Sequence, residues 1–419
     1  MALLALAAAA WPADPLTLEQ AQRIAEQRSQ ALVALQAGSA AAREMGVAAG
    51  QLPDPVLKLG LENMPVNGAE RFTLTREFMT MARVGFMQEL THAEKRRART
   101  ARFESEAEAV LAARALALAE LRQGTAKVWL ERHYQERMLE ALQLLRAEAD
   151  LQVQAADSSY RGGGGAQADL FATRSALALI DDRIGSVKAQ IAMATTRLAR
   201  WIGFDATQAL GAAPVLHILG VDPVTLESRI AAHPQIALLA KQEDAARAEG
   251  LVAQSDKLAD WSMELMYSQR GSAYSNMVSL NFSRPLQWDQ KNRQDRAIAA
   301  KLAQVDQIRA QREELARERL ADIRAWLQEW QSNRERLARY EATLVPLASE
   351  RTRATLAAYR GGAGPLASVL EARRMEIDIR IDRLRLEMET AALWAQLNFS
   401  IPDGPGMALR DQATTVMER

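Results

Sequence analysis

A glycine-rich turn occurs twice in this sequence, each time between two long segments of helical pattern. The copies are Tyr160-Arg161-Gly162-Gly163-Gly164-Gly165 and Tyr359-Arg360-Gly361-Gly362-Ala363-Gly364. Glycine adopts positive φ without steric cost and commonly follows the last residue of a helix, so each copy predicts a tight reversal between two helices. Because the copies lie about 199 residues apart, we expect the chain to consist of two copies of one unit.

The repeat extends beyond these turns, and its parts follow one another in the same order in both halves. The matching pairs are Asp14–Glu19 with Asp222–Glu227, Phe86–Leu90 with Phe282–Leu286, and Trp129-Leu130 with Trp326-Leu327. The alternative is that helices rich in Ala, Arg and Leu look alike by composition, but chance matches do not stay in register. We expect a first repeat over residues 14–215, a second over 216–403 and a C-terminal tail over 404–419.

The segment from Met1 to Trp11 is apolar and rich in alanine. It resembles the end of a secretory signal peptide, with small residues at Ala8 and Ala10 for cleavage. It lacks the basic start of such signals, so a frayed N-terminal helix is the alternative. We treat residues 1–13 as a signal-peptide remnant and leave them out of the fold argument.

The counts of charged residues and of cysteine exclude several classes of function. Lys+Arg and Asp+Glu both number 52, which gives no support to a nucleic-acid partner. The chain contains no cysteine, so a disulfide framework, a thiolate metal site and a cysteine nucleophile are excluded. After the N-terminal segment no run of 18 apolar residues occurs, and no transmembrane helix is predicted.

Helical pattern occupies most of the chain. Its segments cover residues 17–50, 92–158, 166–201, 225–258, 290–358 and 366–398, with Thr17 and Thr225 as N-caps, a possible division at His233-Pro234 and an interruption at Pro346. A helix over 92–158 is about 100 Å long, which a compact globular domain cannot hold. Two of the shorter helices placed end to end are about as long as one long helix. The turns are therefore expected at one end, the strands at the other and the irregular segments between them in a belt midway, where Trp129, Trp201, Trp326 and Trp394 also fall.

Four short segments alternate between apolar and polar residues, which indicates strands with one apolar face. They cover residues 56–63, 83–90, 261–268 and 277–286, so each repeat carries one strand pair. In the first strand Leu57, Leu59 and Leu61 share a face, and in the fourth Val278, Leu280 and Phe282 do so. The fold class is therefore mostly α with a small β part, in two repeats of a strand pair plus a long helical hairpin.

The apolar faces of the strands have no stretch of chain long enough to cover them. Either the sheet packs on another domain, or several copies close it in a membrane, where only closed barrels are stable because every backbone group must be paired. Three chains give twelve strands, a workable number. Trp261 and Trp288 lie at the helix end of the sheet, and Tyr267 and Tyr274 lie toward its far end. Two such aromatic levels are typical of the interfaces of an outer-membrane barrel.

The paired units of strands, long helix, glycine turn and short helix resemble the TolC-type outer membrane factors. The resemblance is carried by Tyr-x-x-Gly followed by Asp169-Leu170-x-Ala172 in the first copy and by Val369-Leu370-x-Ala372 in the second, and it covers Asp14 to about Ile401. The stretch Pro53–Leu90, with Asn63-Met64-Pro65-Val66 and Thr80-Met81, is similar to the CzcC-like branch, which serves heavy-metal efflux.

The resemblance implies a homotrimer in the outer membrane of a Gram-negative bacterium. A twelve-stranded β-barrel in outer-membrane lipid would continue into a twelve-helix periplasmic α-barrel. The partners would be a periplasmic adaptor, or membrane fusion protein, and an inner-membrane RND pump. The expected function is a passive exit duct, for divalent heavy-metal cations such as cobalt, zinc, cadmium or copper. Drugs or other small molecules are the alternative cargo. A periplasmic adaptor or a coiled-coil structural protein is a less favoured reading, because adaptors contain more strands and a coiled coil leaves the alternating strands unexplained.

The glycine turns are then the tunnel tips, where the adaptor docks and the pore closes. The expected tip residues are Tyr160, Arg161, Gly162, Gly163, Asp169, Tyr359, Arg360, Gly361, Gly362 and Ser368, the last standing where the first copy has Asp169. We expect Gly162 and Gly361 to need backbone angles that a Cβ would strain. We also hypothesise that Arg161 or Arg360 contacts Asp169 of a neighbouring chain and helps to hold the pore closed.

Signals for catalysis or cofactor binding are weak, and we predict no enzyme, cofactor or resident metal site. His133 and Glu136 form one fragment of a carboxylate–histidine site without the remaining ligands. Met64, Met79, Met81 and Met87 gather around the first strand pair, where a relay for a soft metal ion is an alternative to plain packing. The charged run Arg309–Arg319 is interpreted as a solvated helix face, some of whose charges line an aqueous tunnel.

Overall fold

A computed structural model describes residues 15–220 and 228–400. The signal-peptide remnant, the N-cap at Thr225 and the tail over 404–419 lie outside these residues. The chain forms two compact units that do not coincide with the sequence repeats, because each takes segments from both. Unit 1 comprises the described residues of Met1–Leu32, Ala115–Pro234 and Ala316–Arg419, and unit 2 comprises Val33–Arg114 and Gln235–Leu315.

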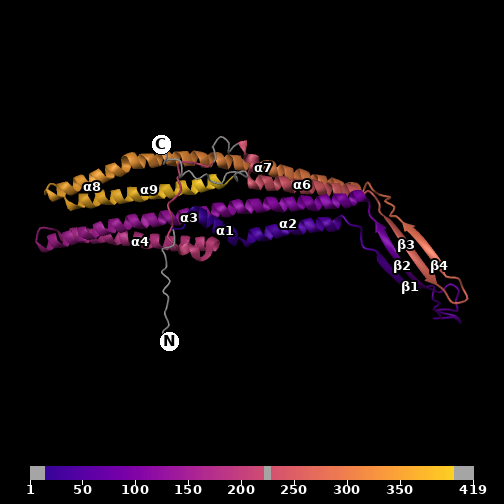
Figure 1. Cartoon of the computed structure of the whole chain (residues 1–419). Helices are drawn as coiled ribbons and strands as arrows, with labels where there is room; N and C mark the ends of the chain where they lie inside the picture. The colour runs from indigo at the N-terminus through magenta and orange to yellow at the C-terminus, as the bar shows by residue number, and fades with distance from the viewer. Residues whose placement is uncertain (1–14, 221–227, 401–419) are drawn as a thin grey trace, which may run out of the picture. The chain divides into compact units, whose positions relative to one another are not determined.

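The elements confirm a mostly helical chain with a small sheet (Figure 1). The first half contains α1 (Leu18–Arg28), α2 (Gln30–Ala49), β1 (Val56–Glu62), β2 (Met81–Leu90), α3 (Ala93–Arg161), α4 (Gln167–Ile202) and the 3₁₀ turn η1 (Gly203–Thr207). The second half contains the 3₁₀ turn η2 (Ile230–Ala232), α6 (Pro234–Ser255), β3 (Trp261–Gln269), β4 (Met277–Ser283), α7 (Gln294–Arg339), the π-helical segment η3 (Tyr340–Leu344), α8 (Val345–Arg360) and α9 (Leu366–Ser400).

The helix expected over residues 17–50 is two helices. Thr17 caps α1 as predicted, because its hydroxyl accepts a hydrogen bond from the Gln20 N–H while the Gln20 side chain accepts one from the Thr17 N–H. The break lies at Ser29, whose backbone is extended. Its hydroxyl accepts from the Leu32 N–H at 3.4 Å, so Ser29 satisfies a free donor at the start of α2.

Two proline positions set boundaries in the second half. Strand β4 ends at Ser283 and not at Leu286 as expected, since Pro285 has no N–H to donate and disfavours a ladder position. The interruption expected at Pro346 is the π-helical segment η3, which ends directly before α8. Pro346 lies in the first turn of α8, a position where a residue without an N–H donor is tolerated.

Unit 2 contains one antiparallel sheet in the order β1-β2-β3-β4 (Figure 1). Its register places Leu57, Phe86, Leu265 and Leu280 opposite one another across all four strands. Residues directly opposite in antiparallel strands share a face, so this row belongs to one apolar face of the sheet. The grouping of Leu57, Leu59 and Leu61, and that of Val278, Leu280 and Phe282, is therefore confirmed. These side chains are solvent-exposed in the single chain.

The helices of unit 2 follow the order of the strands to which they connect. Helix α2 packs on α3, where the Thr100 hydroxyl donates to the Gly46 carbonyl at 3.1 Å. Helix α3 packs on α6, where Lys241 Nζ lies 2.6 Å from Glu108 Oε2. Helix α6 in turn packs on α7, where Lys301 Nζ lies 2.6 Å from Glu249 Oε2. Among the residues that the structure describes, β1 and β4 are therefore the edge strands of the sheet, and α2 and α7 are the first and last helices in this series.

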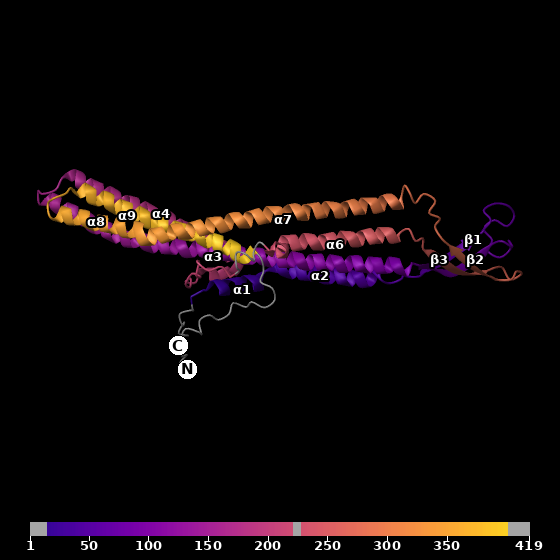
Figure 2. The same ribbon diagram turned by 90° about the horizontal axis from the view of Figure 1, so that it is seen from above.

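Unit 1 contains the two helical hairpins, α3 with α4 and α8 with α9, which lie side by side in both views (Figures 1 and 2). One buried cluster joins them through Leu142 on α3, Ile184 on α4 and Ile381 on α9. A second, larger cluster includes Trp129, Trp330 and Trp394. Within residues 15–220 and 228–400, no helix has an apolar stretch long enough to cross a bilayer.

Three tryptophans of the second cluster donate indole hydrogen bonds to irregular backbone. Trp129 donates to the Leu16 carbonyl at 3.2 Å, Trp330 to the Leu216 carbonyl at 3.2 Å, and Trp394 to the Ile218 carbonyl at 2.8 Å. The partner that matches Trp129 in this role is Trp330, one helical turn after the Trp326 expected from the sequence. A buried indole N–H needs an acceptor, so these bonds fix the irregular segments to the helices.

Candidate functional sites

The two glycine turns have the same backbone geometry. Positive φ occurs at Gly163 (75°) and Gly362 (70°), the second glycine of each turn. The expectation of strain at Gly162 and Gly361 was wrong for Gly361, whose φ is −82°, and Gly162 has no positive φ either. The reason is that the N–H groups of Gly162 and Gly361 still bond helically, to Ser158 and Ala357, so the chain leaves the helix one residue later.

Alanine at Gly163 or at Gly362 is expected to destabilise the tip by about 1–2 kcal/mol, because a Cβ at positive φ crowds the backbone. An added Cβ meets no other atom within 4 Å at either position, so the cost comes from the backbone alone. Gly162→Ala and Gly361→Ala are the matched controls, and we expect them to be close to neutral. Limited proteolysis at the tips, with thermal unfolding as a second measurement, should distinguish the variants at Gly163 and Gly362 from the two controls. Equal sensitivity in all four variants contradicts the assignment.

Charged side chains near the turns divide into paired and unpaired groups. Arg161 Nε lies 2.8 Å from Asp157 in its own helix, and Arg174 of α4 lies 3.7 Å from the same carboxylate. Arg360 ends α8 and Asp169 stands in the first turn of α4. Among the described residues of one chain, neither Arg360 nor Asp169 has an ion pair. Both therefore keep their charge available for a neighbouring molecule, whereas Arg161 is already engaged.

The other expected tip residues are placed as follows. Tyr160 is exposed, Tyr359 is half-buried, and Ser368 donates its N–H to the Pro365 carbonyl in the first turn of α9. Each tyrosine precedes its arginine at the end of a helix, so the two tips match in sequence position, although the two tyrosines differ in exposure.

Ion pairs tie the two hairpins of unit 1 to each other. Arg183 on α4 lies 2.7 Å from Asp378 on α9, and Arg373 on α9 pairs with Glu148 on α3. Arg373 also binds the buried Glu376 at 2.8 Å. Burial raises the pKa of Glu376, but hydrogen bonds from Thr352 and Arg373 and the nearby Arg380 outweigh it and hold the pKa below its usual range. Glu376 is therefore held ionised between the hairpins.

The aromatic residues expected at membrane interfaces are all exposed in the single chain. Trp261 opens β3 opposite Leu90 and lies under the Arg284 guanidinium. Tyr267 lies farther along β3, where its hydroxyl accepts from Asn276 at 2.7 Å, and Tyr274 lies under Arg270 in the β3–β4 loop. Trp288 follows β4 and is 88% exposed. Their placement at two interface levels remains a prediction.

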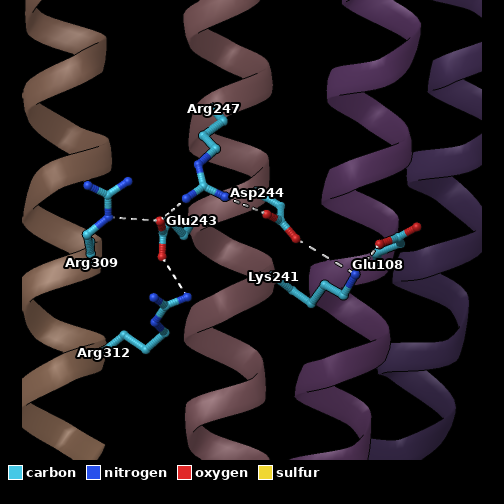
Figure 3. A network of polar contacts seen from close by, with 7 residues as sticks. All are labelled: Glu108, Lys241, Glu243, Asp244, Arg247, Arg309 and Arg312. Carbon is cyan, nitrogen blue, oxygen red and sulfur yellow. Dashed lines mark hydrogen bonds and ion pairs between the residues drawn. The ribbon is translucent and has the colours of Figure 1, made fainter. Parts of the chain in front are cut away.

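A buried carboxylate in unit 2 was not foreseen from the sequence. Glu243 on α6 is fully buried, and three guanidiniums surround it: Arg247 on its own helix and Arg309 and Arg312 on α7 (Figure 3). Arg309 Nε lies 3.3 Å and Arg312 Nη1 2.9 Å from its oxygens. Two residues of the run interpreted as a solvated face thus hold α7 to α6. Glu243 follows the buried Ile236 by seven residues, and this spacing is the signal that could have placed it in the helix seam.

His133 and Glu136 are each engaged by other side chains, and Met81 and Met87 lie far apart on one strand. His133 stacks on Trp129 with ring centres 5.4 Å apart, and burial lowers the pKa of this histidine. Glu136 is bound by Arg132 at 2.8 Å. Met81 and Met87 lie six residues apart on β2, about 20 Å along the strand. In the part of the chain that the structure describes, no group of three or more His, Cys, Asp or Glu side chains could hold a metal ion.

The chain resembles several solved structures in fold, but no known protein family or curated protein matches its sequence. Among solved structures, the outer-membrane channel OprN is 16% identical with a TM-score of 0.77, covering 92% of this chain and 90% of that one. The transmembrane channel CusC is 14% identical with a TM-score of 0.77, covering 92% of each chain. The outer membrane protein VceC from Vibrio cholerae is 15% identical with a TM-score of 0.74, covering 92% of this chain and 96% of that one.

These neighbours are outer membrane channel proteins and not enzymes. At such low identities the likeness concerns the fold alone. The chain therefore has, over nine-tenths of its length, the protomer fold that these channels share.

Proposed function

We propose that this protein is a passive exit duct in the outer membrane of a Gram-negative bacterium, with a large periplasmic part. The observation that carries the proposal is the open four-stranded sheet, whose apolar face exposes large side chains on all four strands. Unpaired edge strands beside an apolar surface are stable in a bilayer only when the sheet closes. The shared fold with outer membrane channels supports the same function.

The strand order supports closure by copies of this chain. All neighbouring strands are antiparallel, so β1 and β4 run in opposite directions and the β4 edge of one copy fits the β1 edge of the next. Three copies give a ring of twelve strands, the even number that such barrels favour. The helices follow the same rule, with α7 of one copy meeting α2 of the next in a ring of twelve helices.

The first experiment is a mass measurement on protein extracted in detergent from outer membranes. We expect a trimer of three 46.2 kDa chains that conducts ions when it is inserted into a planar bilayer. A stable monomer, or recovery in the soluble fraction, would contradict the architecture. Recovery in the soluble fraction would favour the coiled-coil alternative, and a stable monomer would favour packing of the sheet on another domain.

For the tips we propose docking of a periplasmic adaptor, which connects the duct to an inner-membrane RND pump, and closure of the pore between neighbouring chains. The unpaired Arg360 and Asp169 are the best candidates for the contact between tips. An exposed pair contributes about 0–1 kcal/mol, so closure needs all three chains.

Asp169→Ala and Arg360→Ala are each expected to raise single-channel conductance in planar bilayers, and the double variant should add little to either. Arg161→Ala is the matched control, because Asp157 already holds that arginine. If both single variants conduct like the parent, the gate lies elsewhere and these residues serve docking at most.

For the cargo we propose divalent heavy-metal cations such as cobalt, zinc, cadmium or copper, with drugs or other small molecules as the alternative. The support is the resemblance of Pro53–Leu90 to the CzcC-like branch. Among the described residues, no cluster of His, Cys, Asp or Glu adds to this support. Deletion of the gene in its host should lower resistance to these cations. If drug resistance alone falls, the alternative holds.

A further inference from the structure

The polar face of the sheet carries five charged side chains, and four of them are paired within one chain. The five are Lys58 and Glu62 on β1, Arg83 and Glu89 on β2, and Glu264 on β3. Arg83 pairs with Glu62, and Lys58 Nζ lies 3.0 Å from Glu264 Oε2. Glu89, at the helix end of β2, has no ion pair within the described residues. The remaining residues of this face are mainly serine, methionine and glycine.

The Lys58–Glu264 pair is unusual because it joins the first strand to the third. Lys58 stands opposite Gly85 of β2, which stands opposite Met266 of β3. Gly85 leaves the middle strand without a side chain at this level, and a Cβ there would lie 2.7 Å from the Met266 sulfur. The lysine can therefore cross β2 and reach Glu264, two residues before Met266. This contact needs a residue choice on three strands, which marks it as a built feature of the polar face.

We propose that these two cross-strand ion pairs limit the net charge of the pore wall in the sheet to the unpaired Glu89 of each chain, so that this section favours cations only modestly. The inference rests on the proposed function, in which the apolar face meets lipid and the polar face lines the pore. Lys58 is then the residue that keeps Glu264 from adding its charge to that of Glu89. Any stronger discrimination among charged substrates falls to other parts of the duct or to the pump.

The effect of unpairing one charge can be estimated from the ring geometry. Twelve strands spaced about 4.8 Å apart and tilted about 40° form a ring of about 12 Å radius. Loss of Lys58 leaves an unpaired Glu264 in each chain, which adds three negative charges to those of the three Glu89 side chains. In about 0.01 M salt the Debye length of about 30 Å spans the pore, and Coulomb's law in water gives about a threefold rise in cation concentration on the axis.

The test is the reversal potential of single trimers under a KCl gradient with about 0.01 M salt on the dilute side. Lys58→Met should raise the permeability ratio of cation to anion, and Glu264→Gln should lower it, each by about twofold or more. The double variant Lys58→Met/Glu264→Gln is the matched control, since it carries both substitutions without a net change in charge. It should return to the parent's ratio, which separates the effect of charge from any effect of altered packing.

Three outcomes are possible. Opposite shifts in the single variants and recovery in the double variant support the inference. If the parent conducts but both single variants keep its permeability ratio, Lys58 and Glu264 do not influence the charge selectivity of the pore. The inference then fails, while the proposed function stands. If neither the purified parent trimer nor the tip variant Asp169→Ala forms a conducting pore, the proposed function fails, and the inference fails with it.

Discussion

Arginine in place of Leu59 or Leu280 is expected to block assembly in the outer membrane. Leu59 is 73% and Leu280 55% exposed in the single chain, and both lie on the apolar face in the middle of their strands. A mid-bilayer arginine on the lipid face of a barrel costs about 2–4 kcal/mol. Three copies multiply this cost, so the yield of trimer in membrane fractions should fall nearly to zero.

Ser279→Arg is the matched control for this prediction. Ser279 precedes Leu280 in β4 and therefore points to the opposite, polar face of the sheet. In the proposed barrel its arginine would enter the aqueous pore, and the trimer should form in normal yield. Normal trimer from Leu59→Arg and Leu280→Arg, or loss of trimer from Ser279→Arg alone, would show that the faces are assigned the wrong way round.

The second large effect is expected at Glu243. Glu243→Gln keeps the shape of the side chain but leaves three guanidiniums gathered around a neutral amide (Figure 3). Breaking a buried ion pair by removing one partner costs about 3–5 kcal/mol, and the lower end applies here because the arginines are partly exposed. The expected cost of about 3 kcal/mol should appear as a lower unfolding temperature and as easier proteolysis of α7.

Glu108→Gln is the matched control, since it removes a carboxylate from the exposed end of the same network. Glu108 pairs with Lys241 at 2.6 Å, but both side chains are well exposed, and such pairs contribute about 0–1 kcal/mol. Arg309→Gln should fall between the two, because Arg247 and Arg312 still bind the carboxylate. Equal unfolding temperatures for Glu243→Gln and Glu108→Gln would show that the packing of α7 on α6 does not depend on the Glu243 carboxylate.

Much of the fold follows from patterns with a short period. Alternation in β1 and β4 and the long proline-free segments predict the strands and helices to within a few residues. The turn geometry is predicted less well, because Tyr-Arg-Gly-Gly does not say which glycine leaves the helix. That depends on how far the helical hydrogen bonds continue, and they continue to Gly162 and Gly361.

Contacts between segments far apart in the chain could not be predicted from the sequence. The seam between α6 and α7 contains a charged residue where a heptad pattern predicts an apolar one, so Glu243 looks like any surface glutamate until α7 is placed beside it. The Lys58–Glu264 pair depends in the same way on the strand order and on Gly85. In both cases the pairing of elements far apart in the chain decides whether a charge is solvated, buried or neutralised.

The β2–β3 pairing also bears on how such a chain can arise. It joins the two strand pairs inside one molecule by the same antiparallel edge contact that β4 and β1 of two copies would make in the closed sheet. A half-length ancestor with one strand pair and one helical hairpin would therefore close the same ring as a hexamer. Duplication and fusion would leave that ring unchanged while freeing the halves to diverge, as Asp169 and Ser368 have done at the two tips.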